Sequence, residues 1–175
     1  GLNRLSLRLP MMLVSLLALP VLWDFARRMA GRKFALLVLW MAAINPWQIV
    51  QSRWALEANL MGHMMLFSVY FLYLGIHRKP LLYLSMIFFG LTMYSYGITV
   101  YTIPILLLLL CVYLLRRALL RPWEVVFCAA LYLLVSAPFF LMMAVNAFGF
   151  STFTLGPFTI QYFPESIRTE DWAFF

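Results

Sequence analysis

Charged side chains are scarce in this sequence. Asp, Glu, Lys and Arg make up 11% of its 175 residues, whereas hydrophobic residues make up 65%. Soluble domains carry about 25% charged residues, so the composition excludes an ordinary water-soluble domain. We expect a multi-pass protein of the cell membrane, in contact with membrane lipid along most of its length.

The sequence also lacks the common motifs of soluble enzymes. It has no pair of histidines at metal-binding spacing, no glycine-rich phosphate loop and no nucleophile elbow. Cys111 and Cys128 lie in hydrophobic runs, where we expect small buried side chains rather than a disulfide or a metal site. The net charge of +7 comes from basic residues in short junctions between those runs, so no nucleic-acid partner is expected.

Hydrophobic segments set the predicted fold. The uncharged stretch 81–115 is too long for one membrane span and about right for two, and Gly97 and the nearby tyrosines predict a turn within it. Pro10 suits the start of the first helix. We predict an all-α polytopic membrane protein with about six transmembrane helices. The expected segments are 9–25, 34–44, 60–76, 81–94, 101–115 and 123–148, in a bundle over residues 1–150 followed by the start of an external loop at 151–175.

The distribution of basic residues predicts an orientation. If residues 1–8 are outside, the inner junctions hold nine basic residues, which are Arg27, Arg28, Arg32, Lys33, Arg78, Lys79, Arg116, Arg117 and Arg121. The outer side holds four, which are Arg4, Arg8, Arg53 and Arg168. Basic residues concentrate on the cytoplasmic side of membrane proteins, so both ends of the chain are expected on the external face.

One polar segment, residues 45–59, interrupts the hydrophobic runs. Pro46 ends the run before it, and the following residues predict a short external helix beside the membrane. Arg53 and Glu57 are four residues apart, hence on one face of that helix. Such a pair has a structural interpretation, since it stabilises a helix by about 0.2–0.5 kcal/mol. It also has a functional one, because an arginine fork binds phosphate and a carboxylate orients or deprotonates a hydroxyl group.

The other polar residues have simpler interpretations. Asp24 precedes Arg27 and Arg28 by three and four residues, which predicts an interfacial ion pair. Glu124 falls in the first turn of the last helix, where the helix dipole favours a negative charge. His63 follows Asn59 by about one turn and is expected to be a hydrogen-bonded interfacial histidine rather than a ligand.

Two motifs carry a resemblance to a known family. Asn45-Pro-Trp-Gln-Ile49 and Ser52-Arg-Trp-Ala-Leu-Glu-Ala-Asn-Leu60 resemble the segment after the third transmembrane helix of GT-C glycosyltransferases. The most similar group is the bacterial branch of the protein-mannosyltransferase and aminoarabinose-transferase superfamily. Leu7-Arg-Leu-Pro10, the basic stretch 27–33 and Tyr94-Ser-Tyr-Gly97 fit the same pattern.

The resemblance implies an inverting glycosyltransferase that uses a polyprenyl-phosphate sugar donor on the outer face. Arg53 would lie near the lipid phosphate and Glu57 would be an auxiliary catalytic carboxylate, with Asn59, Tyr94 and Tyr96 as further substrate-binding residues. In this family the main catalytic acid lies in the first external loop, after the family's own first helix. The resemblance places both that helix and the acid upstream of Gly1, so we expect them in a longer protein. The acceptor is not indicated. No cofactor follows from these residues, although Glu57 would suit a divalent metal ion.

Two non-enzymatic alternatives remain open at the level of sequence. A lipid or polymer transporter would need polar residues deep in its spans, and the few present, Ser15, Ser68, Ser85 and Ser136, are compatible with helix packing. A structural membrane subunit would use Arg53 and Glu57 only as a helix-stabilising pair.

Overall fold

The computed structural model is a row of antiparallel helices. It describes the backbone of residues 4–53, 57–148, 153–155 and 158–160, and the side chains of residues 9–50, 59–146 and 148. The elements in chain order are α1 (Arg4–Ala30), α2 (Arg32–Ile44), α3 (Pro46–Arg53), α4 (Glu57–Gly75), α5 (Lys79–Thr92), α6 (Thr99–Arg116), α7 (Pro122–Phe148), β1 (Phe153–Leu155) and β2 (Phe158–Ile160). The prediction of an all-α polytopic membrane protein with a short extra helix is confirmed.

Three of the described helices are long and apolar enough to cross a membrane. They are the segments Leu9–Ala30, Thr99–Arg116 and Pro122–Asn146, and α5 is a shorter apolar helix. Many large apolar side chains on these helices are exposed, such as Leu16, Leu108 and Leu134. Exposed leucines in such numbers fit helices that face lipid rather than water.

The first helix is longer than the sequence predicts. Pro10 does not start α1; the helix begins at Arg4 and contains both Pro10 and Pro20. Prolines are tolerated in membrane helices because neighbouring groups satisfy the freed backbone atoms. The expected basic loop at 27–33 also shrinks to a single residue. Gly31 adopts φ 88° and ψ 175°, a conformation that glycine alone adopts readily, and α2 starts at Arg32.

Helix α5 packs closely against both α4 and α7. Phe89, Met93 and Ile103 are fully buried in the core between them and α6. Two glycines allow the close approach: a Cβ at Gly75 would lie 2.5 Å from the Leu82 backbone, and one at Gly90 would lie 2.7 Å from the Val135 side chain. The hydroxyl of Ser85 donates to the main-chain oxygen of Ser68 at 2.8 Å, which joins α5 to α4.

The predicted division of residues 81–115 is confirmed. Helix α5 ends at Thr92, α6 begins at Thr99, and a turn joins them. Thr99 is buried and its hydroxyl donates to main-chain oxygens of Met93 and Tyr96, which closes the turn. The structure therefore contains an α5–α6 hairpin rather than one long helix.

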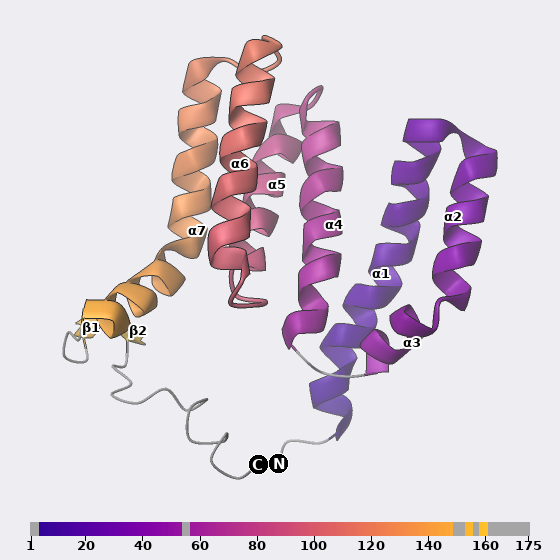
Figure 1. The fold of residues 1–175 in the computed structure, drawn as a ribbon, viewed down its shortest axis with the longest axis horizontal. Helices are drawn as coiled ribbons and strands as arrows, with labels where there is room; N and C mark the ends of the chain where they lie inside the picture. Colours follow the sequence, from indigo (N-terminus) through magenta and orange to yellow (C-terminus); the bar gives the residue numbers. More distant parts are fainter. Residues whose placement is uncertain (1–3, 54–56, 149–152, 156–157, 161–175) are drawn as a thin grey trace.

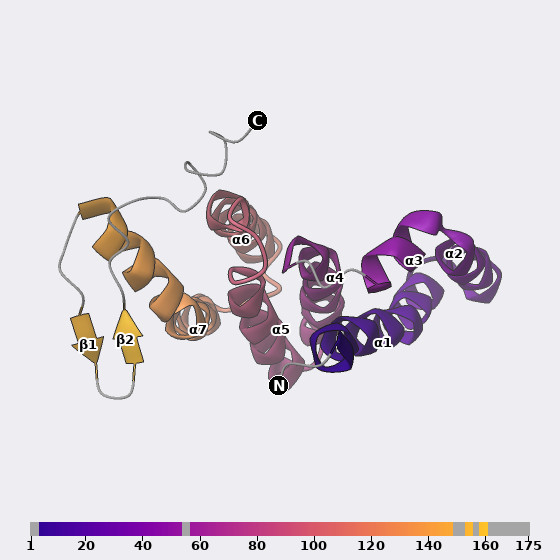
Figure 2. The ribbon, with the colours of Figure 1, turned by 90° about the horizontal axis from the view of Figure 1, so that it is seen from below.

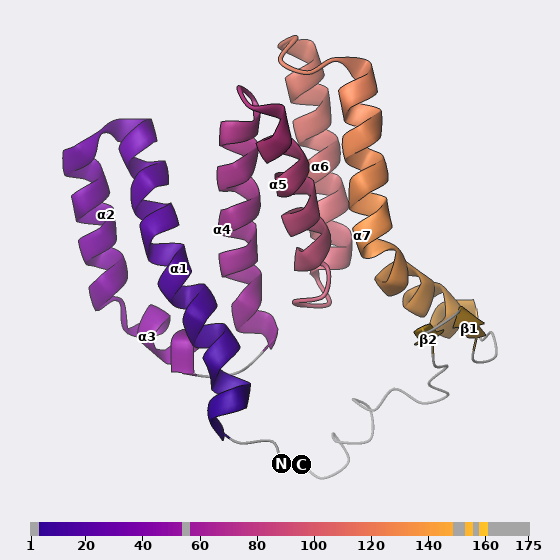
Figure 3. The same ribbon diagram turned by 180° about the vertical axis from the view of Figure 1, so that it is seen from behind.

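The helices place the junctions at two opposite ends of the bundle. The connections α1–α2, α4–α5 and α6–α7 share one end, and α3, the α5–α6 turn and the β1–β2 hairpin lie toward the other (Figures 1 and 3). Seen along the bundle in Figure 2, α1 stands between α2 and α4, and α5 stands between α4 and α7. The first group of connections is the basic end, defined by the nine basic residues named above; the second is called the α3 end.

Candidate functional site

Local sequence explains why α3 forms at the end of the bundle. Asn45 ends α2 with an extended backbone, and its side-chain oxygen accepts a hydrogen bond from the Trp47 N–H at 3.0 Å. Asn45 thus caps the start of α3, and Pro46 occupies the first helical position, where a missing N–H costs nothing. The helix packs against α1 and α2 (Figure 1).

A hydrogen-bonded histidine ties α3 to α4. The Gln48 amide nitrogen and His63 Nε2 are 3.0 Å apart, and His63 Nδ1 is 3.1 Å from the main-chain oxygen of Asn59. The carbonyl oxygen accepts, so Nδ1 carries the hydrogen and Nε2 accepts from Gln48. His63 is 4% exposed and uses both ring nitrogens. The prediction that His63 is hydrogen-bonded is confirmed.

Gln48 and His63 also line a small cavity next to α3. It measures about 220 Å³, and its walls come from α1, α2, α3 and α4: Ala18, Leu19, Leu22, Ala42, Gln48, Gly62, His63 and Leu66. Most of the lining is apolar, with two polar side chains at one side. The cavity therefore offers a partly polar recess beneath the α3 end of the bundle.

Arg53 and Glu57 do not share one helix. Helix α3 ends at Arg53 and α4 begins at Glu57, so the prediction of a single short helix through both is wrong. Helix α4 runs along the bundle while α3 lies at its end (Figure 1), and two helices of different direction cannot share one face. The side chains of both residues lie outside the described part of the chain. Asn59, one turn into α4, is half-buried.

The tyrosines of the α5–α6 turn have separate surroundings. The Tyr94 hydroxyl donates to the main-chain oxygen of Val135 in α7 at 2.8 Å, and its ring meets Phe139 edge-on. Partial desolvation raises the pKa of this hydroxyl, so it keeps its proton. Tyr96 is exposed. Because α4 and α5 stand between α7 and the α1–α3 group (Figure 2), the described structure does not bring Tyr94 beside α3.

The basic end holds two groups of paired charges. Asp24 accepts from Arg27 at 2.8 Å and from Arg28 at 2.5 Å, which confirms the predicted ion pair, and the Tyr70 hydroxyl also donates to it at 2.8 Å. Glu124 accepts from the Arg121 N–H at 2.9 Å and from Lys79 Nζ at 2.9 Å. Sequence reasoning missed Tyr70 and Lys79, because each lies more than forty residues from its partner.

The buried serines bear on the transporter alternative. The hydroxyls of Ser68, Ser85 and Ser136 donate to main-chain oxygens of their own or a neighbouring helix. The Ser15 hydroxyl has no partner among the described residues. Ser68, Ser85 and Ser136 therefore serve helix packing and do not form a continuous polar path.

The described side chains include no cluster of three His, Cys, Asp or Glu residues able to hold a metal ion.

Comparison with known proteins adds the family. The model of a family described as dolichyl-phosphate-mannose-protein mannosyltransferase matches residues 1–142. No curated protein and no solved structure matches the chain significantly. The matched range includes all of α1 to α6 and most of α7.

Proposed function

Because the chain belongs to the dolichyl-phosphate-mannose-protein mannosyltransferase family, we propose that it serves sugar transfer from a polyprenyl-phosphate donor to an acceptor at the α3 end of the bundle. Membership of this family makes the protein a membrane glycosyltransferase of the GT-C type. We further propose that the donor is a polyprenyl-phosphate sugar, that transfer inverts the anomeric carbon, and that the α3 end faces outward. The family match over residues 1–142 is the observation that carries it.

Arg53 and Glu57 have the chemistry that this reaction needs. In an inverting transfer the acceptor hydroxyl attacks the anomeric carbon, the bond from that carbon to the phosphate oxygen breaks, and the lipid phosphate leaves. An arginine fork neutralises the leaving phosphate through paired hydrogen bonds. A carboxylate accepts a hydrogen bond or the proton from the acceptor hydroxyl. We assign the first role to Arg53 and an auxiliary role to Glu57, with Asn59 and the exposed Tyr96 as candidate substrate contacts. Tyr94, whose hydroxyl is bonded to Val135, is left out of this assignment.

The surroundings of α3 support this assignment. The Asn45 cap and the Gln48–His63 hydrogen bond fix α3 against the bundle, so the helix that ends at Arg53 has a defined position. Trp47 is 65% exposed on the same helix, which suits a tryptophan at lipid headgroup depth. A donor phosphate lies at that depth. Rigid elements position charged groups better than free loops do.

The test is sugar transfer by the full-length protein in lipid. We expect Arg53→Ala to lower kcat/KM by about 10- to 100-fold, because a charge-assisted hydrogen bond is worth roughly 1.5–3 kcal/mol. Glu57→Gln should lower kcat by roughly 100-fold, as expected for loss of a proton acceptor. Initial rates with a polyprenyl-phosphate sugar donor measure both.

Arg32→Ala is the matched control, since it removes one exposed arginine from the basic end. It should leave transfer unchanged. Each variant is compared with wild type by size-exclusion profile and helix content. Full activity of both Arg53→Ala and Glu57→Gln would refute their assigned roles. Absence of transfer by the wild-type protein with every polyprenyl-phosphate donor tried would contradict the proposal itself and favour the transporter or structural alternative.

A further inference from the structure

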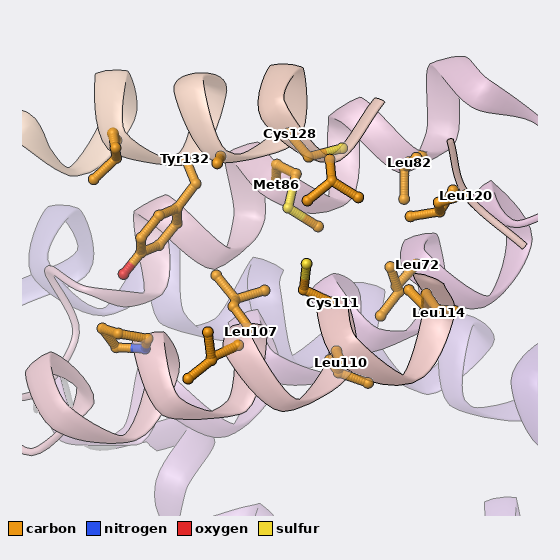
Figure 4. Close-up of a pocket in the computed structure, with 15 residues that line it drawn as sticks. Leu72, Leu82, Met86, Leu107, Leu110, Cys111, Leu114, Leu120, Cys128 and Tyr132 are labelled. Atoms are coloured by element: carbon orange, nitrogen blue, oxygen red, sulfur yellow. The ribbon is translucent and has the colours of Figure 1, made fainter. Parts of the chain in front are cut away.

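A second cavity, unrelated to α3, lies between the last helices of the bundle. It measures about 300 Å³, at the lower end of the range for ligand pockets. Figure 4 shows side chains from α5, α6 and α7 around it, with Leu72 of α4 at one end. The labelled side chains are Leu72, Leu82, Met86, Leu107, Leu110, Cys111, Leu114, Leu120, Cys128 and Tyr132.

The lining is almost wholly apolar. Leucines dominate it, and both cysteines of the chain contribute their thiols. The one hydroxyl group among its lining residues, that of Tyr132, is directed to the sulfur of Met93 at 3.2 Å. An apolar cavity of this kind does not bind water, since a buried water needs two to four polar partners. A ligand that suits this cavity is therefore a hydrocarbon group.

The cavity opens toward the membrane and has the depth of one leaflet. Ala129, Leu108 and Leu133 line it and are exposed at the surface of α6 and α7. Along α6 the lining runs from Pro104 to Leu114, which at about 1.5 Å per residue is roughly 15 Å. That is about half of the ~30 Å hydrocarbon core of a bilayer. A single lipid chain from one leaflet matches both the depth and the opening.

The end of the cavity nearest Leu114 and Leu120 carries more positive than negative charge. Arg116 and Arg117 follow Leu114 within three residues, Arg121 follows Leu120, and all three are exposed. Among the described side chains, Glu124 is the carboxylate near these arginines. It pairs with Lys79 and lies close to Arg121, so one negative charge stands against four positive ones. Clusters of arginines at a membrane surface attract anionic lipid headgroups, by about 1 kcal/mol for each residue.

We propose that this cavity binds one acyl chain of an anionic glycerophospholipid, whose phosphate lies at Arg116, Arg117 and Arg121. The lipid comes from the leaflet at the basic end of the bundle. The proposed sugar donor would instead present its phosphate at the α3 end, so the two sites are distinct. Binding here does not depend on whether the protein transfers sugar.

The test uses the full-length protein in nanodiscs that contain phosphatidylglycerol with a photoactivatable diazirine in its acyl chain. We expect the adducts to map to α6 and α7 on residues that line the cavity. Unlabelled phosphatidylglycerol should compete and phosphatidylcholine should compete far less. Arg116→Gln combined with Arg121→Gln should weaken competition by unlabelled phosphatidylglycerol roughly 30-fold, because two headgroup contacts are lost.

Two pairs of matched variants separate charge from shape. Arg32→Gln with Lys33→Gln removes the same charge from the basic end, away from the cavity, and should leave labelling unchanged. Ala129→Phe should fill the opening and abolish labelling of the cavity, whereas Ala130→Phe, at an exposed neighbouring position outside the lining, should not.

Several results would overturn the proposal. Equal competition by phosphatidylcholine and phosphatidylglycerol would remove the role of the arginines. Adducts spread evenly over all lipid-facing helices would mean ordinary bilayer contact. Labelling displaced by a polyprenyl phosphate but not by phosphatidylglycerol would assign the cavity to an isoprenoid chain instead. If both Ala129→Phe and Ala130→Phe lose labelling with intact helix content, the cavity is not the binding site.

Discussion

His63 and Asp24 illustrate what individual residues do in this bundle. Each carries a polar group into a region of apolar helices, and each is satisfied by partners from a different helix, Gln48 in α3 and Tyr70 in α4 respectively. A polar group in such a place costs free energy unless it is hydrogen-bonded. These contacts therefore act as fixed points that hold α3 and α1 against α4, in addition to side-chain packing.

At this scale we expect Gln48 and His63 to be energetically coupled. Gln48→Leu and His63→Leu should each destabilise the protein, and the double variant should lose less than the sum of the two. Hydrogen bonds between membrane helices contribute about 0.6–2 kcal/mol, and the coupling free energy should fall in that range. Unfolding in mixed micelles measures it. Strict additivity would mean that the 3.0 Å contact contributes nothing to stability.

At the scale of elements, the packing of α5 against α7 depends on a close approach between Gly90 and Val135. Gly90 faces Val135 so tightly that an added Cβ would lie 2.7 Å from its side chain, whereas an added Cβ at Gly62 in α4 meets nothing within 4 Å. Small residues permit such approaches between membrane helices, and dispersion contacts then hold the pair together. Packing of α5 on α7 also forms one wall of the apolar cavity.

We expect Gly90→Ala to destabilise the protein by about 1–3 kcal/mol, the usual cost of overpacking a core. Gly62→Ala, the matched control, should be neutral or slightly stabilising because alanine favours helix. Val135→Ala should partly restore the stability of Gly90→Ala by making room for the new methyl group. Thermal unfolding of the four proteins provides the comparison. Equal stability of Gly90→Ala and wild type would show that the two helices are free to separate.

On the scale of the whole molecule, nine of the 13 basic residues fall in three junctions of the chain. The three basic junctions lie together, opposite α3 and the α5–α6 turn (Figure 3). Basic residues favour the cytoplasmic side of a membrane. The arrangement thus predicts that the basic end faces the cytoplasm and the α3 end faces outward.

We expect a cysteine at Gly97 to react with a membrane-impermeant thiol reagent added to intact cells, and one at Leu119 to react only after permeabilisation. Gly97 is exposed in the α5–α6 turn and Leu119 is 39% exposed in the α6–α7 junction. Wild type is the control, since Cys111 and Cys128 lie within the helices. Labelling of Leu119→Cys but not Gly97→Cys in intact cells would reverse the orientation.

Much of the architecture follows from the sequence alone. The hydrophobic runs predict α1, α2, α4, α5, α6 and α7 with ends within about five residues of those in the structure, because apolar runs of this length form helices in a membrane. The junction at Gly97 and the Asp24 ion pair are local features, and local spacing predicted both. Membership of a glycosyltransferase family was also evident from the residues around Asn45 and Arg53.

The tertiary structure decided what depends on distant contacts. Local signals suggested one helix through Arg53 and Glu57, yet α3 lies at the end of the bundle and α4 runs along it. The contact between Gln48 of α3 and His63 of α4 spans fifteen residues, so local spacing did not reveal it. Lys79 meets Glu124 only after α5 and α7 pack together. The apolar cavity exists because α6 stands away from α5 and α7 along its length, a matter of side-chain shape that periodicity does not encode.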